Sequence, residues 1–110
     1  YWTGCCAALV IQTMNALTNI VYIEIAIQIP HAQSLKEKRH SVKSLKERLQ
    51  AKFNASIAEI GSLDEWQHAV IGVVMISNDR RYLQTQISVM ENILAEFRDV
   101  VLVRVDVQWL

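Results

Sequence analysis

Three histidines, His31, His40 and His68, are the side chains of this 110-residue chain best suited to acid–base or metal chemistry. No pair of them has metal-ligand spacing, and no thiol lies near them in the sequence. The only two cysteines, Cys5 and Cys6, are adjacent, and such a pair rarely closes a disulfide because the ring is strained. We therefore expect no metal, no cofactor and no disulfide framework, and we expect free thiols in a reducing, cytoplasmic compartment.

The sequence also lacks the motifs of nucleophilic and nucleotide-dependent enzymes. Ser77 follows an apolar run as a catalytic serine can, but no Gly-x-Ser-x-Gly surrounds it. No Gly-x-Gly-x-x-Gly or Walker-type loop is present. Glu24 and Asp106 are carboxylates that we expect to bond Arg104 or water rather than to catalyse. The sequence therefore favours a protein that is not an enzyme, with an enzyme acting on a phosphorylated small molecule as the minor alternative.

The charge of the chain is unevenly distributed although its total is zero. Eleven basic residues balance eleven acidic ones, but residues 35–54 hold seven basic and two acidic residues, which gives +5 there and −5 elsewhere. A helix over this range gathers four cations on one flank, about 40° to 120° from Val42. These are Lys36, Arg39, Lys43 and Lys46. Such a stripe could neutralise RNA phosphates; the alternative is a solvated face whose long side chains cover apolar surface.

Alternation of apolar and polar residues predicts four strands. Residues 20–29 carry branched apolar side chains at every second position, and Pro30 ends this strand. Residues 55–60 form a short strand, and residues 67–77 form an apolar central strand. In the last strand, residues 100–109, the inward side chains would be Val101, Val103, Val105 and Val107.

Two amphipathic helices separate these strands. Ser34 and Glu37 form a capping box for a helix over residues 35–54, which Asn54 would end. Asn78 or Asp79 caps the second helix, and Trp66 would anchor a single turn before the third strand. The order β-α-β-β-α-β predicts an α+β protein with the ferredoxin-like split βαβ sandwich, in which two helices cover a four-stranded antiparallel sheet. This domain would span residues 20–110 after an irregular extension over residues 1–19.

The ends of the two helices suggest an anion site. We expect the first and third strands to be parallel neighbours at the centre of this sandwich, so that both helices begin at the same edge. Their free amides and positive dipole ends then favour a phosphate. Asp79 opposes this with its negative charge, and its role as a cap is the preferred one. The residues expected to bind the anion are His31, Ser34, Lys38, Asn78, Arg80 and Arg81.

The outer face of the predicted sheet favours a different kind of contact. Tyr22 is its only aromatic residue on the first strand and the third strand has none, so we do not expect bases to stack on the sheet. The third strand is apolar on both sides, so part of the outer face needs a cover. A second copy of the protein or residues 7–11 would supply it, which makes a homo-oligomeric interaction module the second function considered.

Residues 1–13 contain no methionine, and we interpret them as an upstream extension or an irregular tail, with a thiol-bearing arm as the alternative. They lack the basic leader of a signal peptide. No apolar run reaches the roughly 18 residues of a membrane span, so we expect no membrane partner.

Several separated segments resemble the YlxP-like family of small bacterial proteins, over roughly residues 19–110. They are residues 34–39 after an Ile-Pro-His loop, residues 53–60, Trp66-Gln67, and residues 76–79. The resemblance implies a ferredoxin-like domain of unassigned biochemical function, with a basic signature at 34–39, a helix start at 77–79 and no catalytic residues. Family members lie beside genes for translation initiation and ribosome maturation, which implies a role near the small ribosomal subunit. Residues 1–13 have no counterpart in the family.

We therefore predict a cytoplasmic domain that binds structured RNA, namely ribosomal RNA during ribosome maturation, through its first helix. The partner would be RNA or a ribosomal subunit, and the alternative partner is a second copy of the chain.

Overall fold

A computed structural model describes residues 17–110, and its helices and strands follow the predicted order. The strands and helices are β1 (Asn19–Gln28), α2 (Leu35–Lys52), β2 (Ser56–Gly61), β3 (His68–Ser77), α3 (Arg80–Glu96) and β4 (Val101–Trp109). The predicted strand boundaries are correct to within one residue, and α2 ends two residues earlier than expected. The predictions for residues 1–13 concern a part of the chain that lies outside the described residues.

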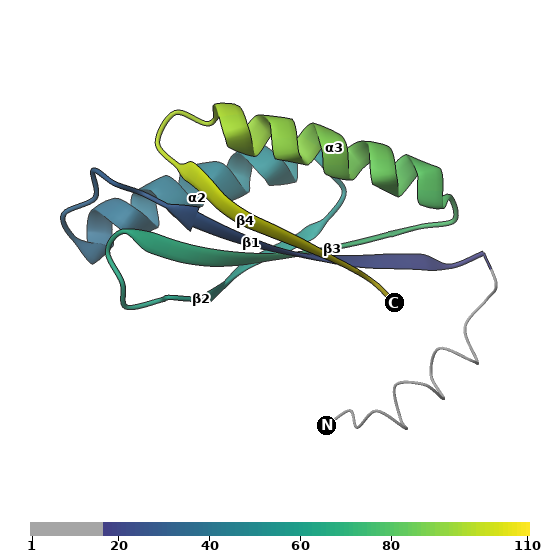
Figure 1. Cartoon of the computed structure of the whole chain (residues 1–110), viewed down its shortest axis with the longest axis horizontal. Helices are drawn as coiled ribbons and strands as arrows, with labels where there is room; N and C mark the ends of the chain where they lie inside the picture. Colours follow the sequence, from purple (N-terminus) through teal and green to yellow (C-terminus); the bar gives the residue numbers. More distant parts are fainter. Residues whose placement is uncertain (1–16) are drawn as a thin grey trace, which may run out of the picture.

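The four strands form one antiparallel sheet in the order β2-β3-β1-β4, and both helices lie on the same face of it (Figure 1). This is the ferredoxin-like arrangement that the sequence predicts. Within residues 17–110, the helices cover one side of the sheet and no helix lies against the other side. The core therefore lies between the helices and the inner face of the sheet.

The relation between β1 and β3 differs from the prediction. Asn19 pairs with Ser77 and Gln28 pairs with His68, so the two central strands are antiparallel. The crossover through α2 returns the chain parallel to β1 in β2, and the short connection to β3 then reverses its direction. Consequently α2 and α3 begin at opposite ends of the sheet (Figure 1), and the prediction that both helices start at one edge is wrong.

The core is built from the predicted apolar positions. The inward side chains of β1 and β3 are almost inaccessible to solvent, and they meet the apolar stripes of the two helices. From the strands these residues are Val21, Ile23, Ile25, Ile27, Ala69, Ile71, Val73 and Met75. From the helices they are Val42, Leu45, Leu49, Leu83, Ile87, Met90 and Leu94.

Strand β4 carries an irregularity that changes which side chains face the core. Ile25 pairs with Val105, but Ile27 pairs with Leu102, because the register shifts after Ala26. The shift reverses the inside–outside alternation, so Leu102 packs against the core while Val101 and Val103 are exposed. The prediction that Val101 and Val103 point inward is therefore wrong.

The helix ends use local side-chain hydrogen bonds. Ser34 Oγ accepts from the Glu37 amide at 3.1 Å, and the Glu37 carboxylate accepts from the amide of Gln33. Asp79, rather than Asn78, caps α3 by accepting from the amides of its first turn. Phe53, rather than Asn54, occupies the C-cap position of α2, and its amide donates to the carbonyl of Leu49.

Lys38 is the largest departure from the predicted surface of α2. Its side chain is fully buried, and Nζ donates to a carboxylate oxygen of Glu59 at 2.8 Å. The same ammonium donates to the carbonyls of Ser62 at 2.8 Å, Leu63 at 3.3 Å and His68 at 3.4 Å. Four acceptors compensate the desolvation of this charge. Lys38 therefore joins α2 to the connection between β2 and β3.

A second set of bonds holds the same connection, which we call the 62–67 loop. The Gln67 side chain donates to the carbonyls of Pro30 and Ala32, each at 3.1 Å. The Gln67 carbonyl accepts from the Ile29 amide at 2.8 Å. The 62–67 loop is thereby bonded both to α2 and to residues 29–32, which connect β1 to α2.

Replacing Lys38 with methionine should lower the free energy of unfolding by about 3–5 kcal/mol, because Glu59 loses its partner in a largely buried position. Urea denaturation would measure the change. Lys36→Met removes an exposed cation two residues earlier and should change the free energy by about 0.5 kcal/mol or less. Equal stability of the two variants would contradict a stabilising role for the buried ion pair.

Candidate functional site

The four cations predicted to lie on one side of α2 are accessible to solvent. Lys36, Arg39 and Lys43 are exposed and Lys46 is half-buried. We call these four residues the basic flank. Among residues 17–110, no carboxylate lies within ion-pair distance of any of them. The predicted cationic surface is therefore present and is not neutralised by neighbouring side chains.

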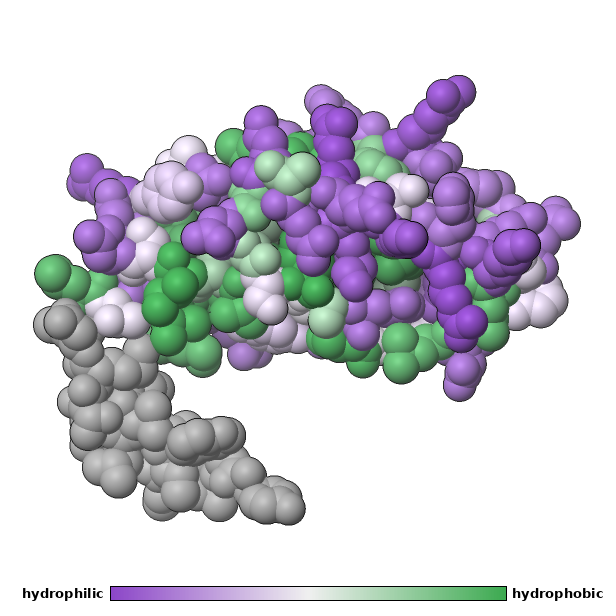
Figure 2. Space-filling model, turned by 180° about the vertical axis from the view of Figure 1, so that it is seen from behind, coloured by the Kyte–Doolittle hydropathy of each residue, from purple (hydrophilic) through white to green (hydrophobic). Residues whose placement is uncertain are grey.

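The basic flank faces away from the second helix. Arg48 and Lys52, on the other side of α2, line a groove with Val89, Ile93 and Glu96 of α3. At about 100° per residue, the basic flank lies roughly opposite this helix–helix groove. Figure 2 shows hydrophilic side chains over much of the helix layer, with hydrophobic ones gathered lower on the molecule along the sheet. Neither α3 nor the helix–helix groove therefore blocks the approach of a large partner to the basic flank.

The predicted anion site is not assembled. Because the helices begin at opposite ends of the sheet, His31 and Ser34 lie at one end, and Asn78, Arg80 and Arg81 lie at the other. A single phosphate cannot contact both groups. The reason is the antiparallel register of β1 and β3, which the prediction had taken as parallel.

Two members of that predicted site already have other partners. Lys38 is buried against Glu59 and three carbonyls, so it presents no charge to solvent. The Arg80 guanidinium lies 4.1 Å from the centre of the Trp109 ring, which is a cation–π contact. These two residues stabilise the fold rather than offer a free anion site.

A groove of about 590 Å³ lies at the start of α2 and carries both signs of charge. His31, Lys36 and His40 line it, together with the carboxylates of Glu37 and Asp99. The His31 Nε2 atom lies 3.9 Å from an Asp99 carboxylate oxygen. With two carboxylates in its wall, this groove is not a dedicated anion pocket.

The outer face of the sheet holds a small polar cluster at its centre. The Arg104 guanidinium contacts the carboxylate of Asp106 and lies 3.6 Å from that of Glu24, so the predicted ion pairing is confirmed. Desolvation raises the pKa of the Tyr22 hydroxyl above its usual value, and the neighbouring Glu24 raises it further. The charges of this cluster are largely satisfied within it.

Apolar side chains surround this cluster. Val74 and Ile76 of β3 are 41% and 61% exposed, and Ile60 and Val103 are also exposed. Gly72 is buried because Ile60 and Tyr22 cover it, so that a Cβ there would lie only 3.2 Å from Ile60. The two-sided apolar character predicted for the third strand is confirmed. Its outward side chains are largely uncovered by residues 17–110.

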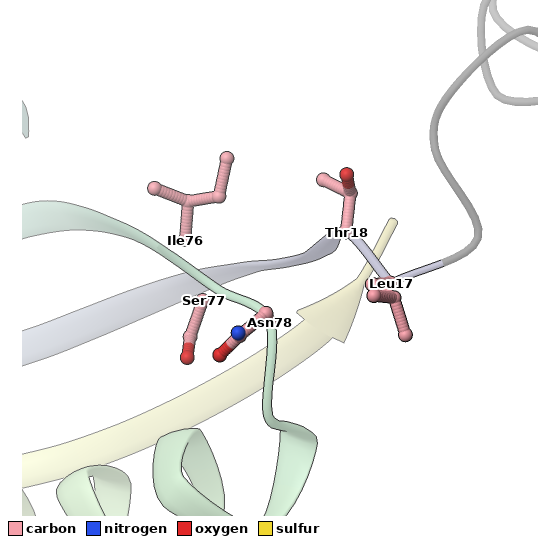
Figure 3. A pocket seen from close by; sticks show the side chains of 5 residues that line it. All are labelled: Leu17, Thr18, Ile76, Ser77 and Asn78. Atoms are coloured by element: carbon pink, nitrogen blue, oxygen red, sulfur yellow. The ribbon is translucent and has the colours of Figure 1, made fainter.

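Thr18 and Ile76 mark one end of this apolar surface. Their side chains point to the same side of the sheet, whereas Ser77 and Asn78 point toward α3 (Figure 3). Together with Leu17 these residues line a shallow groove. Ser77 lies beside no histidine in this groove, which gives its hydroxyl no general base there.

Trp66 lies elsewhere than predicted. It is 54% exposed and does not anchor the turn, because Gln67 and Lys38 hold the loop through hydrogen bonds. Leu63 in the same loop is 52% exposed. This surface was not predicted from the sequence, because Trp66 was expected to serve as the apolar anchor of the turn.

Within residues 17–110, no three His, Cys, Asp or Glu side chains are placed to hold a metal ion. No helix in this part of the chain is both long and apolar enough to cross a membrane.

Comparisons with known proteins agree with the resemblance seen in the sequence. The family model described as "Protein of unknown function (DUF503)" matches residues 20–107. The "Uncharacterized protein YlxP" of Bacillus subtilis (strain 168) is 44% identical over 61 residues, which are 56% of this chain and 66% of that relative. Among solved structures, the "De novo designed protein Foldit4" has a TM-score of 0.49 at 14% identity, covering 83% of this chain and 96% of the design. The chain belongs to the YlxP-like family, DUF503.

Proposed function

We propose that this protein binds structured RNA in the cytoplasm without catalysing a reaction, and that the RNA is ribosomal RNA during ribosome maturation. The observation that carries the proposal is the basic flank. Four cations lie along one side of one helix, and within residues 17–110 none of them forms an ion pair. An unneutralised stripe of this kind attracts a polyanion by releasing its condensed counterions.

The spacing of the cations suits a nucleic-acid backbone. Lys36, Arg39, Lys43 and Lys46 advance by three or four residues, so they follow one side of α2 over about three turns, or roughly 15 Å. Arginine offers a planar fork to phosphate oxygens, and the lysines supply mobile point charges. The contacts would thus read the path of the phosphates rather than the bases.

The acidic residues favour one orientation of the RNA. Most of them lie outside α2, and the outer face of the sheet carries Glu24 and Asp106. On that face both carboxylates are paired with Arg104, so it offers RNA no free cation comparable to those of the basic flank. The ribosomal assignment rests on the genes beside which family members lie, as the resemblance implies.

The double variant Arg39→Glu/Lys43→Glu should weaken binding to a 20-base-pair RNA duplex by at least about tenfold at moderate salt, because two phosphate contacts become repulsive. For the unsubstituted protein, four contacts give a slope of about −3.6 in a plot of log affinity against log salt. Fluorescence anisotropy of the labelled duplex would measure both. Co-sedimentation with purified small ribosomal subunits should show the same order of affinities.

The matched control is Arg48→Glu/Lys52→Glu, which makes the same change of charge on the opposite side of the same helix. This control should lose much less affinity than the first variant. Equal losses of RNA affinity in the two variants would mean that only the net charge matters and not its position. Unchanged affinity in Arg39→Glu/Lys43→Glu would contradict the proposed interface.

The apolar outer face of the sheet favours a second candidate function, a homo-oligomeric interaction module. Val74, Ile76, Ile60 and Val103 are exposed on the side of the sheet that neither α2 nor α3 covers. Exposed apolar side chains gathered on one face in this way are typical of a protein–protein contact. The proposed occupant is a second copy, whose matching face would bury the same residues by two-fold symmetry.

If the outer face forms a dimer, the protein should sediment at twice the chain mass of 12.6 kDa. Val74→Glu should convert it to monomers, because two buried carboxylates would meet near the two-fold axis. The control Tyr82→Glu changes an exposed residue of α3 and should leave the mass unchanged. A strict monomer at high concentration in analytical ultracentrifugation would refute this candidate.

A further inference from the structure

The 62–67 loop presents two large apolar side chains to solvent. Trp66 is 54% exposed and Leu63 is 52% exposed, and they lie three residues apart in the chain. An exposed tryptophan gives a large flat surface whose ordering costs little, since the side chain has only two rotatable bonds. The loop thus offers a ready contact surface.

The bonds that hold this loop reduce the entropy that binding would cost. Lys38 Nζ donates to the carbonyls of Ser62 and Leu63. The Gln67 side chain donates to two carbonyls of the connection between β1 and α2. Ser62 also adopts a left-handed backbone with φ of 57°, which is uncommon for a residue with a side chain. A loop ordered before binding retains more of the contact energy as affinity.

The loop lies at the end of the molecule where α2 begins. Lys38, in the first turn of α2, donates to the Leu63 carbonyl at 3.3 Å from the core side of the helix, and Lys36 and Arg39 lie on the outward side of the same turns. Trp66 follows Leu63 by three residues, which is a reach of at most about 10 Å. Figure 1 shows the connection between β2 and β3 at the same end of the molecule as the start of α2. One RNA can therefore contact both surfaces.

We infer that Trp66 stacks on an unpaired base of the RNA whose backbone lies along the basic flank. This inference rests on the RNA-binding function proposed above and names the class of RNA: a helix interrupted by a bulge or ending in unpaired nucleotides. Aromatic side chains stack on such bases because an unpaired base exposes its flat face, while paired bases do not. Trp66 supplies the aromatic surface that the outer face of the sheet lacks.

The charges around Trp66 fix how the nucleotide approaches. Asp64 and Glu65 precede Trp66, and neither forms an ion pair within residues 17–110. These carboxylates repel phosphates, so the backbone stays on α2 and only a base reaches the indole. The arrangement separates backbone binding from base stacking.

The test compares two RNA probes: a fully paired 20-base-pair duplex and the same duplex with a three-nucleotide bulge. The unsubstituted protein should bind the bulged RNA more tightly. Trp66→Ala should weaken binding to the bulged RNA by about fivefold to a hundredfold and leave the affinity for the paired duplex unchanged. Trp66→Phe should keep most of the preference, because a phenyl ring still stacks.

The matched control is Tyr82→Ala, which removes an aromatic side chain of similar exposure, 53%, from the opposite end of the molecule. It should leave both affinities unchanged. As a second readout, the double variant Trp2→Phe/Trp109→Phe retains Trp66 as the sole tryptophan. The fluorescence of Trp66 in this variant should be quenched by the bulged RNA and not by the paired duplex.

The outcomes separate this inference from the function on which it rests. If Trp66→Ala keeps the preference for the bulge, or if the fluorescence of Trp66 does not respond, the stacking role is overturned and the exposed indole is left for a protein partner. Arg39→Glu/Lys43→Glu tests the proposed function separately, because it should weaken binding to both probes. Failure of that variant to weaken either probe would overturn the RNA interface itself.

Discussion

The buried ammonium of Lys38 is the contact on which the arrangement of the two candidate surfaces around α2 depends. By donating to Glu59 and to the carbonyls of Ser62, Leu63 and His68, it joins α2 to β2 and to the 62–67 loop. A buried charge needs such complete pairing, so the helix can adopt only one rotation and one position over this edge of the sheet. That rotation turns the neighbouring cations outward, and the same bonds order the loop that carries Trp66.

The separation of charge follows from the same rotation. One of the seven basic residues of the helix, Lys38, pairs with Glu59, and within residues 17–110 none of the four cations of the basic flank forms an ion pair. Meanwhile Glu24, Arg104 and Asp106 form a cluster on the far face of the sheet, where their charges largely compensate one another. A chain with no net charge can therefore attract a polyanion at one surface, because screening over about 10 Å makes the nearest charges decisive.

The sequence predicts the helices and strands well, but it predicts less well which of their side chains face the core. Periodicity identifies β1 and both helices because their apolar spacing is regular, but the bulge that turns Val103 outward leaves no mark in a run of alternating valines. The burial of Lys38 had a signal: at about 100° per residue it falls between Val42 and Leu45 on the core side of the helix. Its partners could not be predicted, because the Ser62 and His68 carbonyls reach it only through the β2–β3 connection. The direction of β3 could have been predicted, because a helical crossover makes β2 parallel to β1 and a short connection makes β3 antiparallel to β2. This order of connections places the first residues of α2 and α3 at opposite ends of the sheet.

The two candidate surfaces do not compete for the same part of the molecule. The basic flank belongs to the helix layer, and the exposed apolar residues Val74 and Ile76 belong to the opposite face of the sheet. A dimer formed through the outer face would therefore leave two copies of the basic flank accessible. Two linked sites raise the apparent affinity for one long RNA without any new contact, provided that the RNA can span both. Self-association would then strengthen RNA binding, and the loss of dimers in Val74→Glu would weaken the binding of long RNA while sparing a short duplex.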